Sequence, residues 1–192
     1  MNKAFFLDRD GVVNEEVDYL YQPEKVVILP GVAGALRLLR EHGFLTVVAT
    51  NQSGVARGMY GVPDVHAVHD RIRELLAAEG VTVDGFYHCP HHPEYGTPCD
   101  CRKPQPGMLL AACRDFDIDP ARSAMVGDRL SDIEAGRAAG CRACYLLKTG
   151  YGMETIRREN ITGIDVAEDL PDAVARFLKL EHTLSCCARR PG

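Results

Sequence analysis

The chain has 192 residues, of which 46% are hydrophobic and 26% charged, so it can bury one sizeable core but not two ordinary ones. This composition excludes a disordered or fibrous protein. The formal net charge of -5 argues against a nucleic-acid binder, because such domains usually need a basic face that neutralises phosphates.

Apolar runs alternate with segments of helical periodicity, which predicts strands alternating with helices. The first run, residues 4–7, is short and ends abruptly in polar residues, as a buried strand of a parallel sheet does. Further strands are expected, in chain order, at 44–49, 83–87, 124–126 and 143–147. Helices are expected at 32–42, 64–79, 106–116 and 131–139, several of them bounded by N-cap, proline or glycine residues.

This alternation requires right-handed crossovers, so we predict an α/β fold: a mostly parallel sheet with helices on both faces. A single domain should span residues 1–180. Residues 181–192 lack apolar periodicity, and we expect them to form a flexible tail. The segments after Gly11 and after Thr50 are too short to contain a separate cap domain.

The N-terminus has the features of neither a signal peptide nor a membrane span, because its apolar run passes directly into Asp8. We therefore expect a cytoplasmic protein without a membrane partner. In that reducing compartment, the clustered members of the 8 cysteines are expected to bind metal rather than to form disulfides.

Three predicted strands end in the polar residues Asp8, Thr50 and Asp128. Ligands of open parallel sheets bind beyond the carboxyl ends of the strands, so we expect these side chains to share one site. Asp8 and Asp10 stand two positions apart, and such a pair suits phosphate chemistry: one carboxylate can attack phosphorus while its neighbour protonates the leaving oxygen and later activates water. Alone, the DRDG segment at 8–11 would also suit an ordinary turn.

Adjacent carboxylates repel a phosphate dianion, so this chemistry needs positive charge and hydrogen-bond donors nearby. The TNQSG segment at 50–54 offers hydroxyl, amide and backbone donors, and Arg102-Lys103 offers a fork and a point charge. Asp128 could complete a Mg²⁺ site with Asp8. Each feature alone has a plainer interpretation, as a polar turn, a surface pair of cations or a helix N-cap. Their order and their positions at strand ends together favour an enzyme that acts on phosphate.

A second group of metal ligands precedes Lys103: Cys89, a histidine, Cys99 and Cys101. Three cysteines and one histidine would form a tetrahedral zinc site, and four protein ligands leave no open position, so the zinc would be structural. His91 competes with His88 and His92 for the fourth position.

Four segments resemble the motifs of the haloacid dehalogenase (HAD) superfamily of phosphatases: DRDG at 8–11, TNQ at 50–52, RKP at 102–104, and GD at 127–128 with Asp132. The resemblance covers residues 3–150 and implies an HAD-like Rossmannoid fold. It implies a Mg²⁺-dependent phosphoric monoester hydrolase with an aspartyl-phosphate intermediate. The implied roles are nucleophile for Asp8, general acid/base for Asp10, phosphoryl-group binding for Thr50 and Lys103, and Mg²⁺ binding for Asp8, Asp128 and the backbone carbonyl of Asp10.

Within the superfamily, the segments TNQSGVARG at 50–58, CPHH at 89–92 and CDCRKPQPGM at 99–108 look most like the sugar bisphosphate phosphatases that have a zinc-binding loop. This resemblance favours His91 as the zinc ligand beside Cys89, Cys99 and Cys101. It implies a small sugar bisphosphate as substrate. The implied substrate contacts are Glu16, Val17, Asp18, Tyr19, Asn51, Gln52, Ser53, Arg57, Arg102 and Arg129, of which the three arginines would give a basic rim for the second phosphate.

Two alternatives stay open at this point. Histidinol-phosphate phosphatases also have a Cys/His loop before RKP, although Ser53, Ala56 and Arg57 and the PGM that follows RKP favour the sugar enzyme. A noncatalytic zinc-loop interaction module belongs to a different class of function and leaves the paired Asp8 and Asp10 unexplained. We expect a monomer.

Overall fold

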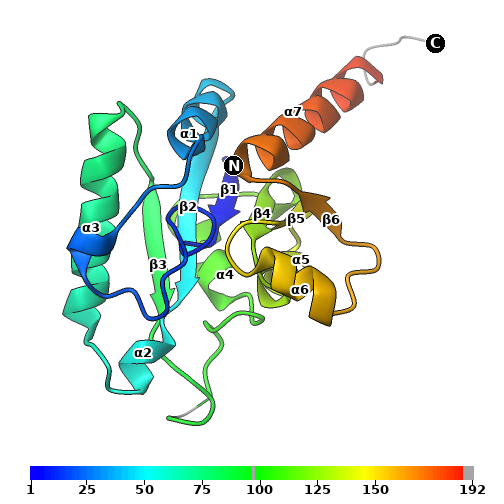
Figure 1. The fold of residues 1–192 in the computed structure, drawn as a ribbon. Coiled ribbons are helices and arrows are strands. Elements are labelled where there is room, and N and C mark those ends of the chain that lie inside the picture. Colours follow the sequence, from blue (N-terminus) through cyan, green and yellow to red (C-terminus); the bar gives the residue numbers. More distant parts are fainter. Residues whose placement is uncertain (97, 188–192) are drawn as a thin grey trace.

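The structure, a computed structural model, describes residues 1–96 and 98–187. Six parallel strands form one sheet in the order β3-β2-β1-β4-β5-β6 (Figure 1). The strands are β1 (Lys3–Leu7), β2 (Phe44–Asn51), β3 (Gly85–Cys89), β4 (Ala124–Gly127), β5 (Ala143–Leu147) and β6 (Asp165–Ala167). The helices are α1 (Val32–Glu41), α2 (Ser53–Ala56), α3 (Val62–Ala78), α4 (Gly107–Asp115), α5 (Leu130–Ala139), α6 (Gly152–Arg158) and α7 (Leu170–Cys187), with 3-10 turns η1 (Pro23–Lys25) and η2 (Pro120–Arg122).

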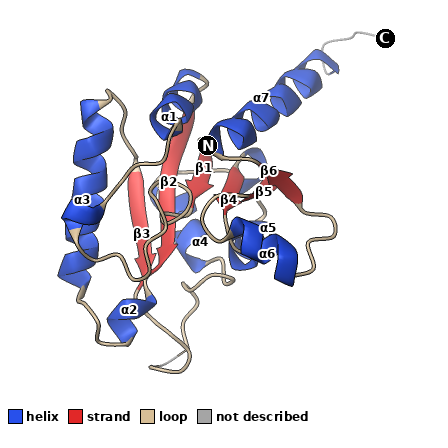
Figure 2. Ribbon diagram, in the orientation of Figure 1, coloured by secondary structure: helices blue, strands red, loops and turns tan. Residues whose placement is uncertain are grey.

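Helices cover both faces of the sheet (Figure 2), which confirms the predicted α/β fold. Phe5 and Leu7 of β1 belong to a core shared with α1, α3 and α7. Ala4 and Phe6, which point the opposite way, belong to the core shared with α4 and α5. Both faces are buried, and this explains why the strands are continuous apolar runs rather than alternating ones.

The strand order reverses at β1. From β1 the chain runs outward through β2 to β3, and it then returns to place β4 on the other side of β1. Such a switch point leaves a crevice beyond the carboxyl ends of the strands. Asp8 follows β1 and Asp128 follows β4, and the Asp8 N–H donates to the carbonyl oxygen of Val126 at 2.9 Å. The topology therefore brings the two aspartates to one crevice.

Helix α7 corrects one sequence-based expectation. We predicted no helix after residue 139 and expected a loose tail from residue 181, but α7 spans Leu170–Cys187. Phe177 anchors it on the sheet, with its ring centroid 5.0 Å from that of Phe5. One turn further, Glu181 pairs with Lys3 at 3.8 Å and with Arg142 at 3.3 Å, which gives this turn tertiary partners. Residues 188–192 of the predicted tail lie outside the described residues.

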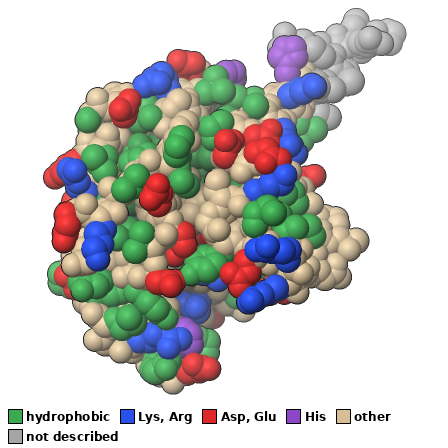
Figure 3. Space-filling view, in the orientation of Figure 1, with side chains coloured by type: hydrophobic (Ala, Val, Ile, Leu, Met, Phe, Trp, Pro, Cys, Tyr) green, Lys and Arg blue, Asp and Glu red, His purple; other side chains and the backbone are tan. Residues whose placement is uncertain are grey.

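The other differences are smaller. Strand β3 begins and ends two residues later than predicted, and β6, α2 and α6 are short elements that periodicity did not indicate. In the described residues no cap domain is inserted: the β1–α1 connection contains the single turn η1, and the four-residue helix α2 follows β2. None of the helices in this part of the chain has an apolar stretch long enough to cross a membrane. Acidic and basic side chains are interspersed over the face in Figure 3.

Candidate active site

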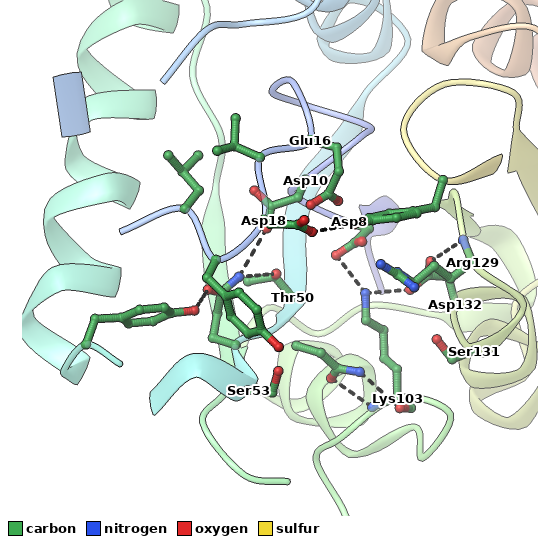
Figure 4. A pocket seen from close by; sticks show the side chains of 17 residues that line it. Asp8, Asp10, Glu16, Asp18, Thr50, Ser53, Lys103, Arg129, Ser131 and Asp132 are labelled. Carbon is green, nitrogen blue, oxygen red and sulfur yellow. Dashed lines mark hydrogen bonds and ion pairs between the residues drawn. The ribbon is translucent and has the colours of Figure 1, made fainter. Parts of the chain in front are cut away.

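A polar cavity of about 260 Å³ opens beyond the carboxyl ends of β1 and β2 (Figure 4). It contains every predicted catalytic residue and all the predicted substrate contacts except Arg57 and Arg102. Its lining residues are Asp8, Asp10, Glu16, Val17, Asp18, Tyr19, Leu20, Thr50, Asn51, Gln52, Ser53, Tyr60, Lys103, Arg129, Ser131, Asp132 and Tyr151.

Lys103 provides a buried positive charge at the base of the cavity. Its Nζ lies 2.8 Å from Asp8 Oδ1 and 2.5 Å from Asp132 Oδ1 (Figure 4). Burial acts to lower the pKa of Lys103, but the Asp132 and Asp8 carboxylates outweigh it and raise the pKa above its ordinary value. Lys103 is therefore a fixed cation beside the Asp8 carboxylate.

Asn51 fixes the backbone of Lys103. Its Nδ2 donates to the carbonyl oxygen of Lys103 at 3.0 Å, and its Oδ1 accepts from the Lys103 N–H at 3.0 Å. This reciprocal pair joins the end of β2 to the segment that carries Lys103. Asn51 thus positions the lysine in addition to lining the cavity.

Asp8, Asp128 and Asp132 form a cluster of buried carboxylates whose ligand oxygens all lie within 4.8 Å of one another. Burial raises the pKa of Asp8 to about 6, although the Lys103 charge opposes the rise. Burial, together with the Asp8 and Asp132 charges, raises the pKa of Asp128 to about 8. The single positive charge of Lys103 therefore does not offset the burial and mutual repulsion of the three carboxylates.

This cluster fits a Mg²⁺ ion. Asp128 Oδ2 accepts a hydrogen bond from the Tyr151 N–H at 2.7 Å, whereas Asp128 Oδ1 is buried and has no hydrogen-bond partner among residues 1–96 and 98–187. Mg²⁺ prefers oxygen ligands of this kind, and its charge would offset the repulsion that raises the pKa values. A Cβ at Gly11 would lie 2.4 Å from Asp128 Oδ2, and Gly11 also has a φ of +78°, so the cluster requires glycine there.

The Asp10 carboxylate lies outside this cluster and accepts hydrogen bonds from three side chains. One of these is Arg9, its neighbour in the chain. Asn14 Nδ2 donates to Oδ1 at 2.9 Å, and Gln52 Nε2 donates to Oδ2 at 3.2 Å. Gln52 Nε2 also lies 2.9 Å from Thr50 Oγ1, so one amide links Asp10 to Thr50.

The outer wall of the cavity carries charges of both signs. The Arg129 guanidinium lies over the ring of Tyr151, 3.9 Å from its centroid, and the Tyr151 hydroxyl donates to Asp18. Burial raises the pKa of Glu16 to about 7, and the Asp10 and Asp8 charges add to the rise.

The predicted zinc ligands Cys89, His91, Cys99 and Cys101 come together in a second cluster. Cys89 Sγ lies 3.6 Å from His91 Nδ1, 3.6 Å from Cys99 Sγ and 3.1 Å from Cys101 Sγ, and Cys101 Sγ lies 3.4 Å from His91 Nδ1. A tetrahedral ion with Zn–S of about 2.3 Å and Zn–N of about 2.0 Å separates its ligand atoms by roughly 3.5–3.8 Å. The donor set fits Zn²⁺, and the two separations of 3.6 Å lie within this range, whereas Cys89 Sγ and Cys101 Sγ, at 3.1 Å, are closer together than a bound ion would hold them.

The two competing histidines are engaged elsewhere. The His88 ring packs edge-on against His66, with centroids 5.3 Å apart. His92 Nδ1 accepts from the Glu94 N–H at 3.2 Å, and its Nε2 lies 3.3 Å from Arg57 Nη2. His91 is thus the histidine that joins the cysteines.

Arg57 and Arg102 contact the zinc-binding loop, residues 89–101. The Arg57 guanidinium lies 4.6 Å from the ring centroid of Tyr95 and donates to its hydroxyl at 3.1 Å. Arg102 Nη1 donates to the carbonyl oxygen of His91 at 3.1 Å. Of the three arginines expected to form a basic rim, Arg129 is the one that lines the cavity.

Sequence reasoning assigned no role to several residues of the site. Asp132 was noted within a motif, but its ion pair with Lys103 was not predicted. Tyr151 lies between two glycines, four residues beyond the end of β5, and was not singled out from the sequence. Tyr60, whose hydroxyl donates to Gln52 Oε1 at 2.8 Å, lies between two helices and was not singled out either.

Comparisons with known proteins agree with this geometry. Residues 100–173 match the HAD-hydrolase-like family. The chain is 45% identical over 183 residues to the D-glycero-D-manno-heptose-1,7-bisphosphate 7-phosphatase of Thermosynechococcus vestitus, covering 89% of this chain and 93% of that protein. It is 41% identical to the D-glycero-beta-D-manno-heptose-1,7-bisphosphate 7-phosphatase of Escherichia coli, with coverage of 92% and 95%.

Comparison with a crystal structure indicates the same family. The D,D-heptose 1,7-bisphosphate phosphatase of B. bronchiseptica, complexed with magnesium and phosphate, superposes with a TM-score of 0.83 at 40% identity, covering 93% of this chain and 99% of that one. The paired aspartates, the buried lysine and the carboxylate cluster thus occur on a fold and a sequence shared over almost the whole length of these enzymes. The chain therefore belongs to the D-glycero-D-manno-heptose-1,7-bisphosphate 7-phosphatase family of the HAD superfamily.

Proposed function

We propose that this enzyme hydrolyses the C7 phosphate of D-glycero-D-manno-heptose 1,7-bisphosphate and releases heptose 1-phosphate, a step toward the activated heptose of the lipopolysaccharide core. The observation that carries the proposal is the contact of Lys103 with Asp8, at 2.8 Å, in the polar cavity of a chain from this family. A carboxylate beside a buried cation is suited to attack a phosphoryl group whose charge the same cation attracts.

In the first half-reaction, an Asp8 oxygen forms a bond to phosphorus while the bond from phosphorus to the C7 oxygen breaks. Asp10 gives its proton to that oxygen, and Thr50 and Lys103 bind the transferring phosphoryl group. In the second half-reaction, a water attacks the aspartyl phosphate, Asp10 takes a proton from that water, and phosphate leaves with Asp8 restored.

The Mg²⁺ ligands in this proposal are the Asp8 and Asp128 side chains and the backbone carbonyl of Asp10. Bound there, the ion supplies the positive charge that an anionic substrate needs beside buried carboxylates. Zn²⁺ held by Cys89, His91, Cys99 and Cys101 would have a structural role, because four protein ligands leave no open position for a substrate.

The rest of the substrate lies against the outer wall in this proposal. Contacts come from Glu16, Val17, Asp18, Tyr19, Asn51, Gln52 and Ser53. Arg129 binds the phosphate that is not transferred, because its guanidinium is a fork suited to phosphate and it lines the cavity. Arg57 and Arg102, which contact the zinc-binding loop, contribute from the edge of the site.

Histidinol phosphate is a second candidate substrate for a specific reason. The outer wall contains Asp18, whose carboxylate would attract the ammonium of histidinol, and Glu16, which adds to the attraction when it is ionised. The expected repulsion by a basic rim is weakened, because Arg57 and Arg102 are bonded to the zinc-binding loop.

A substrate panel tests the proposal. Release of phosphate from heptose 1,7-bisphosphate, fructose 1,6-bisphosphate and histidinol phosphate gives kcat/KM for each, and phosphorus NMR gives the order in which the two heptose signals disappear. We expect heptose bisphosphate to be preferred and its C7 signal to disappear first. Early loss of the C1 signal, or a preference for histidinol phosphate, would reject the substrate assignment.

The nucleophile is tested by Asp8→Asn, which keeps the shape of the side chain and removes its charge. Turnover should fall by several orders of magnitude, because an amide does not attack phosphorus. The variant should retain zinc, since Asp8 lies outside the zinc cluster. Near-normal turnover in a zinc-loaded variant would rule out this role.

We also propose that the enzyme acts as a monomer in the cytoplasm. Cys89, Cys99 and Cys101 are free thiols in close contact, and a reducing compartment keeps such cysteines available for zinc. Sedimentation velocity of the purified protein measures the oligomeric state.

A further inference from the structure

Arg9 lies between the two catalytic aspartates in the chain, yet its side chain is buried, with 1% of the residue exposed. Its guanidinium meets Asp10 through three contacts: Nε lies 3.0 Å from Oδ1 and 3.1 Å from Oδ2, and Nη2 lies 2.8 Å from Oδ2. Arginine is rarely buried without a partner that accepts its hydrogen bonds. Here the partner is the proposed general acid/base itself.

We infer that Arg9 is a positioning residue that orients the Asp10 carboxylate for proton transfer. The inference rests on the proposed function, in which Asp10 protonates the leaving oxygen and then accepts a proton from water. A planar guanidinium that reaches both carboxylate oxygens fixes rotation about the last side-chain bond, which a single point charge does not.

The backbone around Arg9 supports this role. The carbonyl oxygen of Arg9 accepts from the N–H groups of Val13 at 2.9 Å and Asn14 at 3.1 Å, so the turn that carries the guanidinium is itself fixed. Nη2 also lies 3.3 Å from the carbonyl oxygen of Leu20, at the end of the loop that lines the cavity. The guanidinium thus joins Asp10 to the Leu20 carbonyl oxygen, and it projects from a turn that is itself hydrogen-bonded.

The other donors to Asp10 do not replace Arg9. Asn14 makes one contact, to Oδ1, and Gln52 makes one, to Oδ2. Gln52 Nε2 is shared with Thr50, and its Oε1 accepts from the Tyr60 hydroxyl. Without Arg9, each oxygen keeps a single amide donor, and no planar group contacts both oxygens.

A purely structural role makes a different prediction. If Arg9 served only to hold the loop at residues 15–20, its loss would disturb substrate contacts and raise KM for every substrate. If Arg9 acts through Asp10, its loss lowers kcat most where the leaving oxygen needs a proton. Alkyl and aryl phosphates separate these outcomes, because a nitrophenolate leaves without protonation and a sugar alkoxide does not.

The experiment compares Arg9→Met, Arg9→Lys, Asp10→Asn and the double variant Arg9→Met/Asp10→Asn on heptose 1,7-bisphosphate and p-nitrophenyl phosphate. Proton transfer contributes about 10²–10⁴ in rate, and we expect Arg9→Met to lose roughly 10–10² of it in kcat for the heptose substrate. The loss for p-nitrophenyl phosphate should be several-fold smaller. Arg9→Lys, which keeps the charge but not the fork, should fall between wild type and Arg9→Met.

The double variant gives the sharpest result. If Arg9 acts through Asp10, the double variant should be no slower than Asp10→Asn alone, because the group that Arg9 orients is already disabled. Arg37→Met is the matched control: Arg37 is exposed, donates to the Glu79 carbonyl oxygen and should leave kcat unchanged. Zinc content and melting temperature show that each variant is folded, and Arg9→Lys provides the test if Arg9→Met does not fold.

Two failures are distinguishable. If Asp10→Asn itself shows equal losses on both substrates, the proposed role of Asp10 is wrong, and the inference fails with it. If Asp10→Asn depends on the leaving group but the Arg9 variants lose equally on both substrates, or if the Arg9→Met and Asp10→Asn losses multiply, Arg9 does not act through Asp10.

Discussion

Replacing Lys103 by methionine tests whether the site depends on one buried cation. The substitution keeps an unbranched side chain of similar length and removes the ammonium. In the structure this ammonium contacts the carboxylates of Asp8 and Asp132, whose side chains are 11% and 1% exposed, respectively. Removing it leaves both carboxylates buried without their cation.

The expected loss of stability is large. Breaking a buried ion pair by deleting one partner costs about 3–5 kcal/mol. For a domain of this size, each kcal/mol shifts the melting temperature by about 2–4 °C, so Lys103→Met should melt roughly 6–20 °C lower. The folded variant should also lose about 10²–10³ in kcat, the typical effect of removing one group that stabilises transition-state charge.

The assay is urea unfolding followed by far-UV circular dichroism, because the chain has no tryptophan to report by fluorescence. The buffer omits Mg²⁺ and contains no chelator, so that zinc stays bound. The matched control is Lys148→Met. Lys148 pairs with Glu168, but the two side chains are 40% and 64% exposed, and such surface pairs contribute about 0–1 kcal/mol.

A second variant identifies the cause of the loss. Adding Asp132→Asn to Lys103→Met removes one of the two carboxylates left without a cation, so part of the lost stability should return. The reasoning is refuted if Lys103→Met is as stable as Lys148→Met, or if Asp132→Asn brings no recovery.

Two further predictions concern the metals. Cys99→Ser and Cys101→Ser should each reduce bound zinc, measured by elemental analysis, and lower the melting temperature. Cys113→Ser is the control, because Cys113 lies outside the cluster, and it should keep both the zinc and the melting temperature. Full zinc content in the first two variants would contradict the assignment. In Mg²⁺-free protein, the free energy of unfolding should fall as pH rises from about 4 to about 8. Burial raises the pKa of Asp8 to about 6 and that of Asp128 to about 8, so folding favours their protonated forms, and this stability is lost as each group ionises. Added Mg²⁺ should therefore raise the melting temperature more at pH 8 than at pH 5, and an equal rise at both would speak against a carboxylate site.

The sequence could predict the residues at the ends of strands, because ligands of parallel sheets bind beyond the carboxyl ends of the strands. Asp8, Thr50 and Asp128 each follow a continuous apolar run, and parallel pairing with a switch point at β1 brings such ends together whatever the details of packing. The zinc ligands were predictable for a similar reason, because their residue types permit few other uses in one short loop.

The rest depended on side-chain orientation, which residue type does not reveal. Arg57 and Arg102 are the residues expected around a bisphosphate, yet their guanidinium groups face Tyr95 and the His91 carbonyl oxygen instead. Arg9 was passed over because an arginine between two aspartates could equally point to solvent. Helix α7 was not predicted at all, and the partners of its turn at Glu181, Lys3 and Arg142, are remote in the chain.

The proximity of the zinc cluster to Lys103 has a consequence for protein engineering. Cys101 lies two residues before Lys103, and the Cys89 carbonyl oxygen accepts from the Gln52 N–H at 2.8 Å, so both ends of the zinc-binding loop are tied to the catalytic centre. The stretch between His91 and Cys99 begins and ends at members of the proposed zinc cluster. Doubling the length of such a closed loop costs only about 0.6 kcal/mol in closure entropy. An epitope or sensor peptide grafted between those two residues should therefore be carried beside the active site without displacing the lysine.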